Sequence, residues 1–102
     1  MILFEWDTAK ARTNQRKHGV SFEIARHVFD DPYTLAEQDR IENAELRWQT
    51  IGMVDGLLLL LVAHTVECGG DEQDETVRII SARRANRGER TRYEKERQKN
   101  YS

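Results

Sequence analysis

The segment Leu46–Val66, LRWQTIGMVDGLLLLLVAHTV, determines the fold. Leu46–Met53 and Leu57–Val66 are rich in apolar and β-branched residues, and Asp55-Gly56 lies between them. An Asp-Gly pair between two apolar runs is a strong hairpin signal, because both residues tolerate the positive φ angles that a tight turn requires. We therefore predict two antiparallel strands, the second of them in the core.

Three shorter strands are predicted around this hairpin. Ile2–Trp6 alternates between apolar side chains on one face and mixed side chains on the other. Tyr33–Glu37 forms a strand that precedes an acidic connection, and Thr76–Ala82 is the last strand. Each is short and bounded by polar residues, as expected for a small sheet.

Two helices are predicted before the hairpin. The first begins after an N-cap at Asp7 or Thr8 and runs to His18, where Gly19 supplies the left-handed terminating residue. The second begins after Ser21 and ends at 30–32, Asp-Asp-Pro. Its apolar stripe consists of Phe22, Ala25, Val28 and Phe29.

A third helix is predicted at the end of the chain. Asn86 and Glu89 form an N-x-x-E capping pattern, although Gly88 weakens the first turn. The segment beyond Tyr93 is mostly charged, so the tail from about residue 96 is expected to fray or to be ordered by a partner. The element order is β-α-α-β-β-β-β-α in a single domain, 1–102, which defines an α+β fold on a mainly antiparallel sheet.

Charge is strongly segregated in this chain of 102 residues with a net charge of −2. Thr76–Tyr93 carries Arg83, Arg84, Arg87, Arg90 and Arg92, and the segment from Ser81 onward holds eight Lys/Arg against three Glu. Residues 67–75 carry five acids and no base. The arginine block predicts an anionic ligand, and guanidinium forks suit phosphate. The slightly acidic total argues against a general DNA-coating protein.

A reducing, cytoplasmic location is expected. Cys68 is the only cysteine, no secretory leader pattern is present at the N-terminus, and the longest apolar run, Leu57–Ala63, is too short to cross a bilayer. His64 and Cys68 lack a second pair of ligands at metal-binding spacing, so neither a metal nor a cofactor is predicted.

One face of the first predicted helix is polar. Lys10, Asn14, Lys17 and His18 share it at helical spacing, with no acidic neighbour. A solvated surface is the simpler interpretation. The alternative is a polyanion site in which His18, with an unperturbed pKa of about 6.5, transfers a proton.

Arginines also occur at the ends of the predicted strands, each next to a residue whose side chain points to the opposite face of the sheet. Alternation sends Arg83 and Arg84 to opposite faces, so one of them can face a ligand while the other packs or pairs with an acid. The alternative is a basic strand end whose charge is balanced by Asp30 or Asp31. Arg47 likewise opposes Trp48, which is expected in the core. On the last helix a solvated face is the favoured interpretation for Arg87 and Arg90. Tyr93 either anchors that helix or stacks on a base.

Two sequence blocks together resemble a known family. They are FEWDTAKARTNQRKHGVSFEIARHVF (4–29) and RIISARRANRGERTRYE (78–94), with Ile51-Gly52 and LLLLLVAHT (57–65) between them. The chain resembles the BrnT toxins of bacterial type II toxin–antitoxin systems over nearly its whole length. The segment 67–75 departs from the family pattern, since it is longer and more acidic than such loops usually are.

The resemblance implies a RelE-like ribonuclease that inhibits translation by cutting RNA. It also implies a BrnA-like ribbon-helix-helix antitoxin that neutralises the toxin in a hetero-oligomer, and contact with operator DNA only through that antitoxin. Without the resemblance, a non-catalytic adaptor that binds nucleic acid or a partner through the same basic face stays open.

Residue roles follow for a metal-independent cleavage. Arginine is no base at pH 7, so Arg83 with Arg47 or Arg84 is expected to stabilise phosphorane charge. His18 is the candidate acid or base, and Glu5 is a weaker candidate base. The predicted RNA contacts are Lys10, Asn14, Lys17, Arg87, Arg90 and Tyr93.

Overall fold

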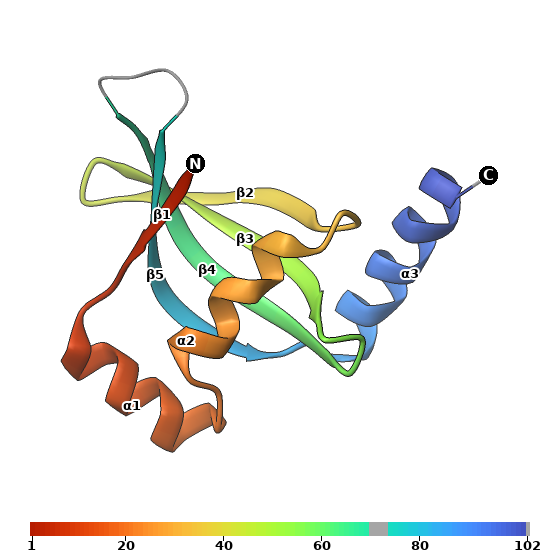
Figure 1. The fold of residues 1–102 in the computed structure, drawn as a ribbon, viewed down its shortest axis with the longest axis horizontal. Coiled ribbons are helices and arrows are strands. Elements are labelled where there is room, and N and C mark those ends of the chain that lie inside the picture. Colours follow the sequence, from red (N-terminus) through yellow and green to blue (C-terminus); the bar gives the residue numbers. More distant parts are fainter. Residues whose placement is uncertain (70–73, 102) are drawn as a thin grey trace.

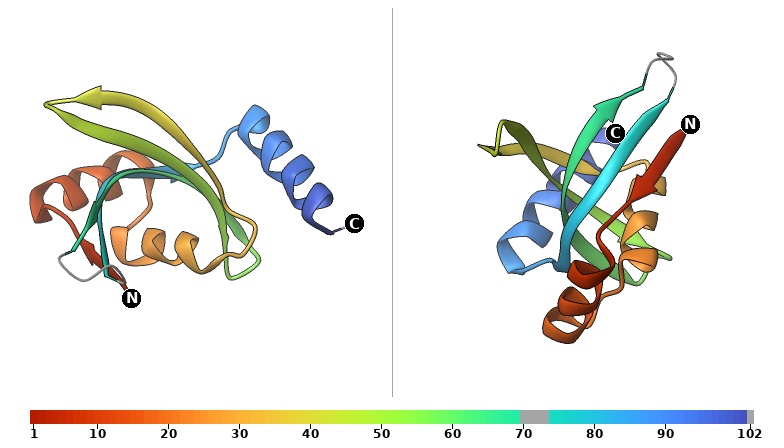
Figure 2. Two further views of the ribbon diagram at one scale, coloured as in Figure 1. Left: turned by 90° about the horizontal axis from the view of Figure 1, so that it is seen from above. Right: turned by 90° about the vertical axis from the view of Figure 1, so that its left-hand side faces the viewer.

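The computed structural model describes residues 1–69 and 74–101 and shows a curved five-stranded sheet with helices on both faces (Figures 1 and 2). The elements in chain order are β1 (Ile2–Glu5), α1 (Thr8–His18), α2 (Phe22–Ala25), the 3-10 helix η1 (Arg26–Asp30), β2 (Leu35–Glu42), β3 (Glu45–Val54), β4 (Leu58–Cys68), β5 (Glu75–Arg84) and α3 (Arg87–Tyr101). The α+β class is as predicted. The order differs from the prediction by η1, which continues α2 in a tighter helix.

The sheet has the strand order β1-β5-β4-β3-β2 and is mixed. Neighbours are antiparallel from β5 to β2, whereas β1 pairs in parallel with β5, Ile2 opposite Glu75 and Glu5 opposite Arg78. The prediction of a mainly antiparallel sheet missed this parallel edge. A parallel pair needs a long connection, and the whole of α1 through β4 provides it.

The strand boundaries differ from the prediction mostly at β2, the polar edge strand of the sheet. The Asp55-Gly56 turn is confirmed, with φ angles of 54° and 69°. β2 continues to Glu42 through the expected acidic connection, and a second turn at Asn43-Ala44, φ 53° and 63°, leads into β3. As an edge strand, β2 tolerates polar residues that a central strand would not.

The predicted helix signals are confirmed. Asp7 accepts a 3.0 Å bond from the amide of Lys10, and Ser21 accepts one of 3.2 Å from Ile24. Gly19 ends α1 in the left-handed region, at φ 71°. These caps orient α1 and α2 so that both lie on one side of the sheet (Figure 2).

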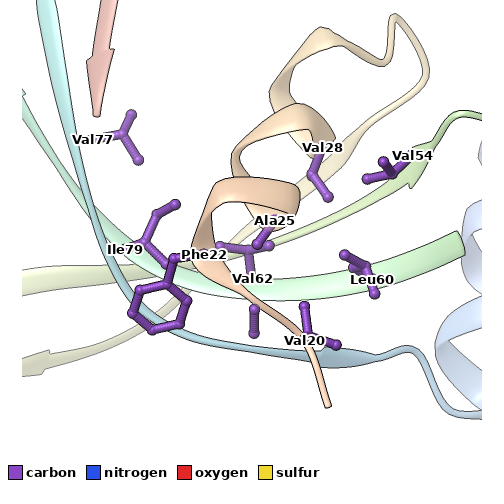
Figure 3. Packing of buried hydrophobic residues seen from close by; sticks show 10 residues of the cluster. Val20, Phe22, Ala25, Val28, Val54, Leu60, Val62, Val77 and Ile79 are labelled. Atoms are coloured by element: carbon purple, nitrogen blue, oxygen red, sulfur yellow. The ribbon is translucent and has the colours of Figure 1, made fainter. Parts of the chain in front are cut away.

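A continuous core fills the space between α1, α2, η1 and the sheet, on what we call the α1–α2 face. Figure 3 shows α2 and η1 lying across the strands with their apolar side chains directed at them. The buried members are Val20, Phe22, Ala25, Val28, Val54, Leu60, Val62, Val77, Ile79 and Ala82. The predicted stripe of the second helix is thus confirmed. η1 approaches β3 so closely that a Cβ on Gly52 would lie 2.6 Å from Val28 Cγ1.

The opposite side, the α3 face, is covered only at one end. Tyr93 of α3 packs with Ile51, Leu59 and Leu61 in a smaller apolar cluster. α3 then extends away from the sheet to Tyr101 (Figure 1). Residues 70–73 of the predicted acidic segment 67–75 lie outside the described residues, while Glu67 and Glu75 belong to the ends of β4 and β5.

Candidate functional site

The side chains of the α3 face are arranged in rows that run across the sheet. Strand register places one row at the end that α3 covers and another row beside it. The first is Arg83, Leu61 and Ile51, and the second is Ser81, Ala63 and Gln49. Alternation along β3 brings Arg47 to the same face as Gln49 and Ile51. Two of the predicted catalytic arginines therefore share one face.

Arg83 is held by the first turn of α3. Its Nη1 and Nη2 donate to the two carboxylate oxygens of Glu89, each at 2.8 Å, and Nη1 also donates to the Arg84 carbonyl at 3.2 Å. The hydrogen bonds that Arg83 donates to Glu89 raise the pKa of Arg83 and lower the pKa of Glu89. The pair is therefore ionised over the whole physiological range.

The carboxylate of Glu89 also caps the N-terminus of α3. It accepts the Asn86 amide at 2.9 Å, while Asn86 Oδ1 accepts the Glu89 amide at 2.8 Å. The predicted N-x-x-E cap is thereby confirmed, although its second partner was not foreseen. Glu89, and not Asp30 or Asp31 of the alternative interpretation, is the carboxylate that pairs with Arg83, because α3 begins beside the end of β5.

Arg47 lies on β3 with its side chain 16% exposed. Its Nη1 is 3.6 Å from Glu42 Oε2, too far for a hydrogen bond. Its Nε is the one buried side-chain nitrogen or oxygen without a hydrogen-bond partner within residues 1–69 and 74–101. A buried donor of a cationic group without a partner is costly, and such sites are typical of ligand contacts.

Other cations of the α3 face are neutralised. Arg78 of β5 pairs with Glu45 of β3, and Nη1 of Arg92 on α3 donates to both carboxylate oxygens of Glu37 on β2, at 2.7 and 2.8 Å. These pairs reduce the excess positive charge that the arginine block predicted. Specific donors, more than net charge, therefore define the site.

The remaining arginines of the block are exposed. Arg84 pairs in register with Leu60, whose side chain is in the core of the α1–α2 face, so Arg84 points away from the face that carries Arg83. The predicted divergence of these two neighbours is confirmed by register. Arg87 and Arg90 are exposed on α3, and no ion pair joins them to the described part of the chain.

The polar face of α1 forms a separate groove of about 330 Å³. Lys10, Lys17 and His18 line it together with Ile80 and Ser81 of β5, but Arg83 does not. α1 and α3 lie at opposite ends of the molecule (Figure 1). The structure therefore places His18 in this groove, whereas Arg83 is held by Glu89 on the α3 face.

Asn14 is buried at the base of this groove with 6% of its surface exposed. Its Nδ2 donates to the carbonyls of Val20 and Ala82, and its Oδ1 accepts the Ala82 amide at 3.0 Å. The side chain completes the edge of β5 in the way a further strand would. These three bonds give Asn14 a structural role, which differs from the RNA contact that the sequence predicted.

Tyr93 is likewise an anchor. It is 1% exposed, and its hydroxyl donates to Asp31 Oδ2 at 2.6 Å. Burial, followed by the bond to Asp31, raises its pKa strongly. Asp31 also accepts the amides of Tyr33 and Met53, so it joins η1, β3 and α3. This role of Asp31 was missed, since the sequence indicated only a helix stop or an arginine partner. The alternative of base stacking by Tyr93 is corrected.

The other histidines and the cysteine do not form a site. His64 is 3% exposed, hydrogen-bonds Thr50 Oγ1 through Nε2 at 2.7 Å, and packs edge-on against Phe29. His27 pairs with Asp30, and Cys68 is exposed. Glu5 is exposed at the end of β1. In the described part of the chain no three His, Cys, Asp or Glu side chains group as metal ligands, and no helix is long and apolar enough to span a membrane.

The fold and the arginine-bearing sheet face define the class of protein, a small α+β protein with guanidinium donors for an anion on one sheet face. The crystal structure of the Brucella abortus ribonuclease toxin BrnT, at 1.1 Å resolution, matches with a TM-score of 0.56 and 25% sequence identity. The match covers 85% of this chain and 99% of that one. A comparison with curated proteins finds no match.

The family described as the ribonuclease toxin BrnT of type II toxin–antitoxin systems matches residues 6–89. The chain therefore belongs to the BrnT family. The match ends at Glu89, so it includes Arg83 and the carboxylate that holds it but excludes most of α3.

Proposed function

We propose that this chain is a metal-independent, RelE-like endoribonuclease that binds RNA across the α3 face. The observation that carries the proposal is that Arg47 and Arg83, on strands separated by β4, share this face within a family of ribonuclease toxins. Each has guanidinium donors without a hydrogen-bond partner in the described part of the chain. The row of Ser81, Ala63 and Gln49 next to Arg83 is small or neutral and leaves room for a ribose-phosphate chain.

The reaction is an attack of the ribose 2′-oxygen on the adjacent phosphorus. The P–O5′ bond breaks, the 2′-hydroxyl proton is lost and the leaving 5′-oxygen gains a proton, which gives a 2′,3′-cyclic phosphate and a 5′-hydroxyl. Arg83 and Arg47 stabilise the negative charge that develops on the non-bridging oxygens. Preorganised charge of this kind accounts for a large part of catalysis in many enzymes.

His18, Lys10 and Lys17 form a second RNA contact at the edge of β5. RNA that leaves the α3 face over Ser81 reaches the α1 groove, which Ser81 also lines. His18 lies there and not beside Arg83, so its role as acid or base requires the RNA to carry the scissile phosphate to that edge. Arg84, Arg87 and Arg90 guide RNA only through long-range charge.

A cognate antitoxin completes the proposed function. It is a BrnA-like ribbon-helix-helix protein that forms a hetero-oligomer with this chain in the cytoplasm, and operator DNA is contacted only through it. The family places the chain in a type II system, which supports a protein partner.

The test is cleavage of a defined RNA by purified protein in EDTA, with product ends analysed by chromatography. Arg83→Ala is expected to lower the single-turnover rate by roughly 100-fold or more. Arg84→Ala, the adjacent arginine on the opposite face, is the matched control and retains the parental rate. RNA that is shifted in a gel but remains intact with the parent protein would support the non-catalytic adaptor instead.

A further inference from the structure

The guanidinium of Arg83 has five N–H groups, and the protein occupies only three of them. Nη1 uses both of its hydrogens, for Glu89 and the Arg84 carbonyl, and Nη2 uses one for Glu89. Nε–H and the second Nη2–H remain, and these two lie along one side of the planar group. Two parallel donors on one edge match two oxygens of a phosphate.

This free edge is open to solvent. Within the described residues, Arg47 Nε is the one buried side-chain nitrogen or oxygen that lacks a partner, so Arg83 Nε, which also has none, is not buried. The side chain of Arg83 is 37% exposed, whereas that of Glu89 is 11% exposed. In this ion pair the guanidinium is therefore accessible to a ligand, whereas the carboxylate is largely buried.

The carboxylate that holds Arg83 is itself fixed by the helix cap. Glu89 Oε1 accepts the Asn86 amide as well as Arg83 Nη1, and Glu89 Oε2 accepts Nη2. A long arginine side chain would otherwise lose considerable rotamer freedom on binding an anion. The cap of α3 therefore orders this side chain before RNA arrives.

We propose that Glu89 is a positioning residue that holds the Nη1–Nη2 end of Arg83, so that its Nε–Nη2 edge faces the phosphate. The catalytic part of this inference rests on the proposed ribonuclease function, but the orientation of Arg83 does not. The opposite role, in which Glu89 competes with phosphate and inhibits, predicts effects of opposite sign.

The variant is Glu89→Gln, which retains a capping side chain but removes the charge and one of the two acceptors for Arg83. Glu37→Gln is the matched control, because Glu37 also pairs with an arginine, accepting both of its bonds from Nη1 of Arg92 on the same helix. Circular dichroism and thermal unfolding verify that α3 is retained in both. The first readout is a titration with inorganic phosphate, followed through the NMR signal of Arg83 Nε–H, which is assigned by its loss in Arg83→Lys.

In the parent, phosphate is expected to shift the Arg83 Nε–H signal, and Glu89→Gln is expected to weaken this binding roughly tenfold. RNA cleavage by Glu89→Gln is expected to fall by about 100-fold, mainly in kcat. The double variant Arg83→Ala, Glu89→Gln should cleave RNA almost as fast as Arg83→Ala alone, because Glu89 acts through Arg83. Glu37→Gln leaves both readouts near parental values.

Tighter phosphate binding or faster cleavage by Glu89→Gln would overturn the proposal in favour of competition. Unchanged values in both readouts would overturn it as well. If the parent cuts no RNA but phosphate binding still depends on Glu89, the ribonuclease proposal fails and the positioning role of Glu89 stands.

Discussion

The two faces of the sheet use polar side chains in opposite ways. On the α1–α2 face, Asn14 is buried and spends its amide on three bonds to the backbone. On the α3 face, Arg83 and Arg47 are only partly satisfied, and Arg83 is held by a single carboxylate. A polar group that is fully satisfied stabilises the fold, whereas one with donors left over is suited to a ligand. Substitutions on the two faces should therefore differ in kind.

The largest effect on stability is expected for Asn14→Ala. The substitution leaves the buried amide and carbonyl of Ala82 without partners, which costs about 3 kcal/mol in the free energy of unfolding. Urea denaturation measures it, and Thr13→Ala, at the exposed neighbouring position, is the control. Cleavage per folded molecule should stay near parental values. A stable but inactive Asn14→Ala would instead return Asn14 to the RNA-binding site.

Gly52→Ala is expected to lower the free energy of unfolding by about 2 kcal/mol. Its Cβ would lie 2.6 Å from Val28 Cγ1 and 2.9 Å from the Val28 carbonyl oxygen, and the backbone cannot move away as a side chain can. Gly88→Ala is the control, since its Cβ meets only Asn86 Oδ1 at 3.6 Å. That change should stabilise α3 slightly. Equal stability of the two variants would show that η1 can shift away from β3.

Acid should weaken the α1–α2 face through His64. Burial lowers the pKa of His64 below its usual value of about 6.5, while its bond to the Thr65 carbonyl opposes this shift. Below about pH 6.5, His64 binds a proton more readily in the unfolded chain than in the folded one. The free energy of unfolding is therefore highest above about pH 6.5 and falls as the pH drops below it. The slope is at most about 1.4 kcal/mol per pH unit.

Thermal unfolding from pH 7.5 to 5 measures this dependence. His64→Gln should flatten the part of the curve below pH 6.5, whereas the exposed His27→Gln should leave it in place. A parental curve that is already flat across this range would contradict a neutral His64 in the folded protein.

Local signals predicted the fold better than the site. Asp55-Gly56, Gly19 and Ser21 act through neighbouring backbone groups, so their roles could be read from the sequence. The parallel pairing of β1 with β5 could not, because it joins residues more than 70 positions apart. Partners of charged side chains are equally non-local. Arg83 was recognised, but whether it would lie beside His18 depended on where α1 meets β5.

The contact of Glu89 with Arg83 was not predicted, because a local sequence pattern already explained Glu89. The N-x-x-E pattern explains it fully as a helix cap, and the cap is present. Its bond to Arg83 arises only because Ala85 and Asn86 turn the chain so that α3 begins beside the end of β5. A carboxylate that follows an arginine at six residues across a strand–helix junction is the signal that was available.

The smallest expected effect comes from the α1 groove. Lys17→Ala removes one cation that contacts RNA away from Arg83, so affinity should fall about threefold at moderate salt, and the slope of log affinity against log salt should decrease by about one. Arg12→Ala on the same helix is the control, because Arg12 lies in a separate depression with Gln15 and Arg16. Filter binding at several salt concentrations, with Arg83→Ala as background to prevent cleavage, measures both. Equal losses for the two variants would reduce α1 to a general source of positive charge. A loss for Lys17→Ala alone would join its groove to the α3 face as one RNA path around the edge of β5.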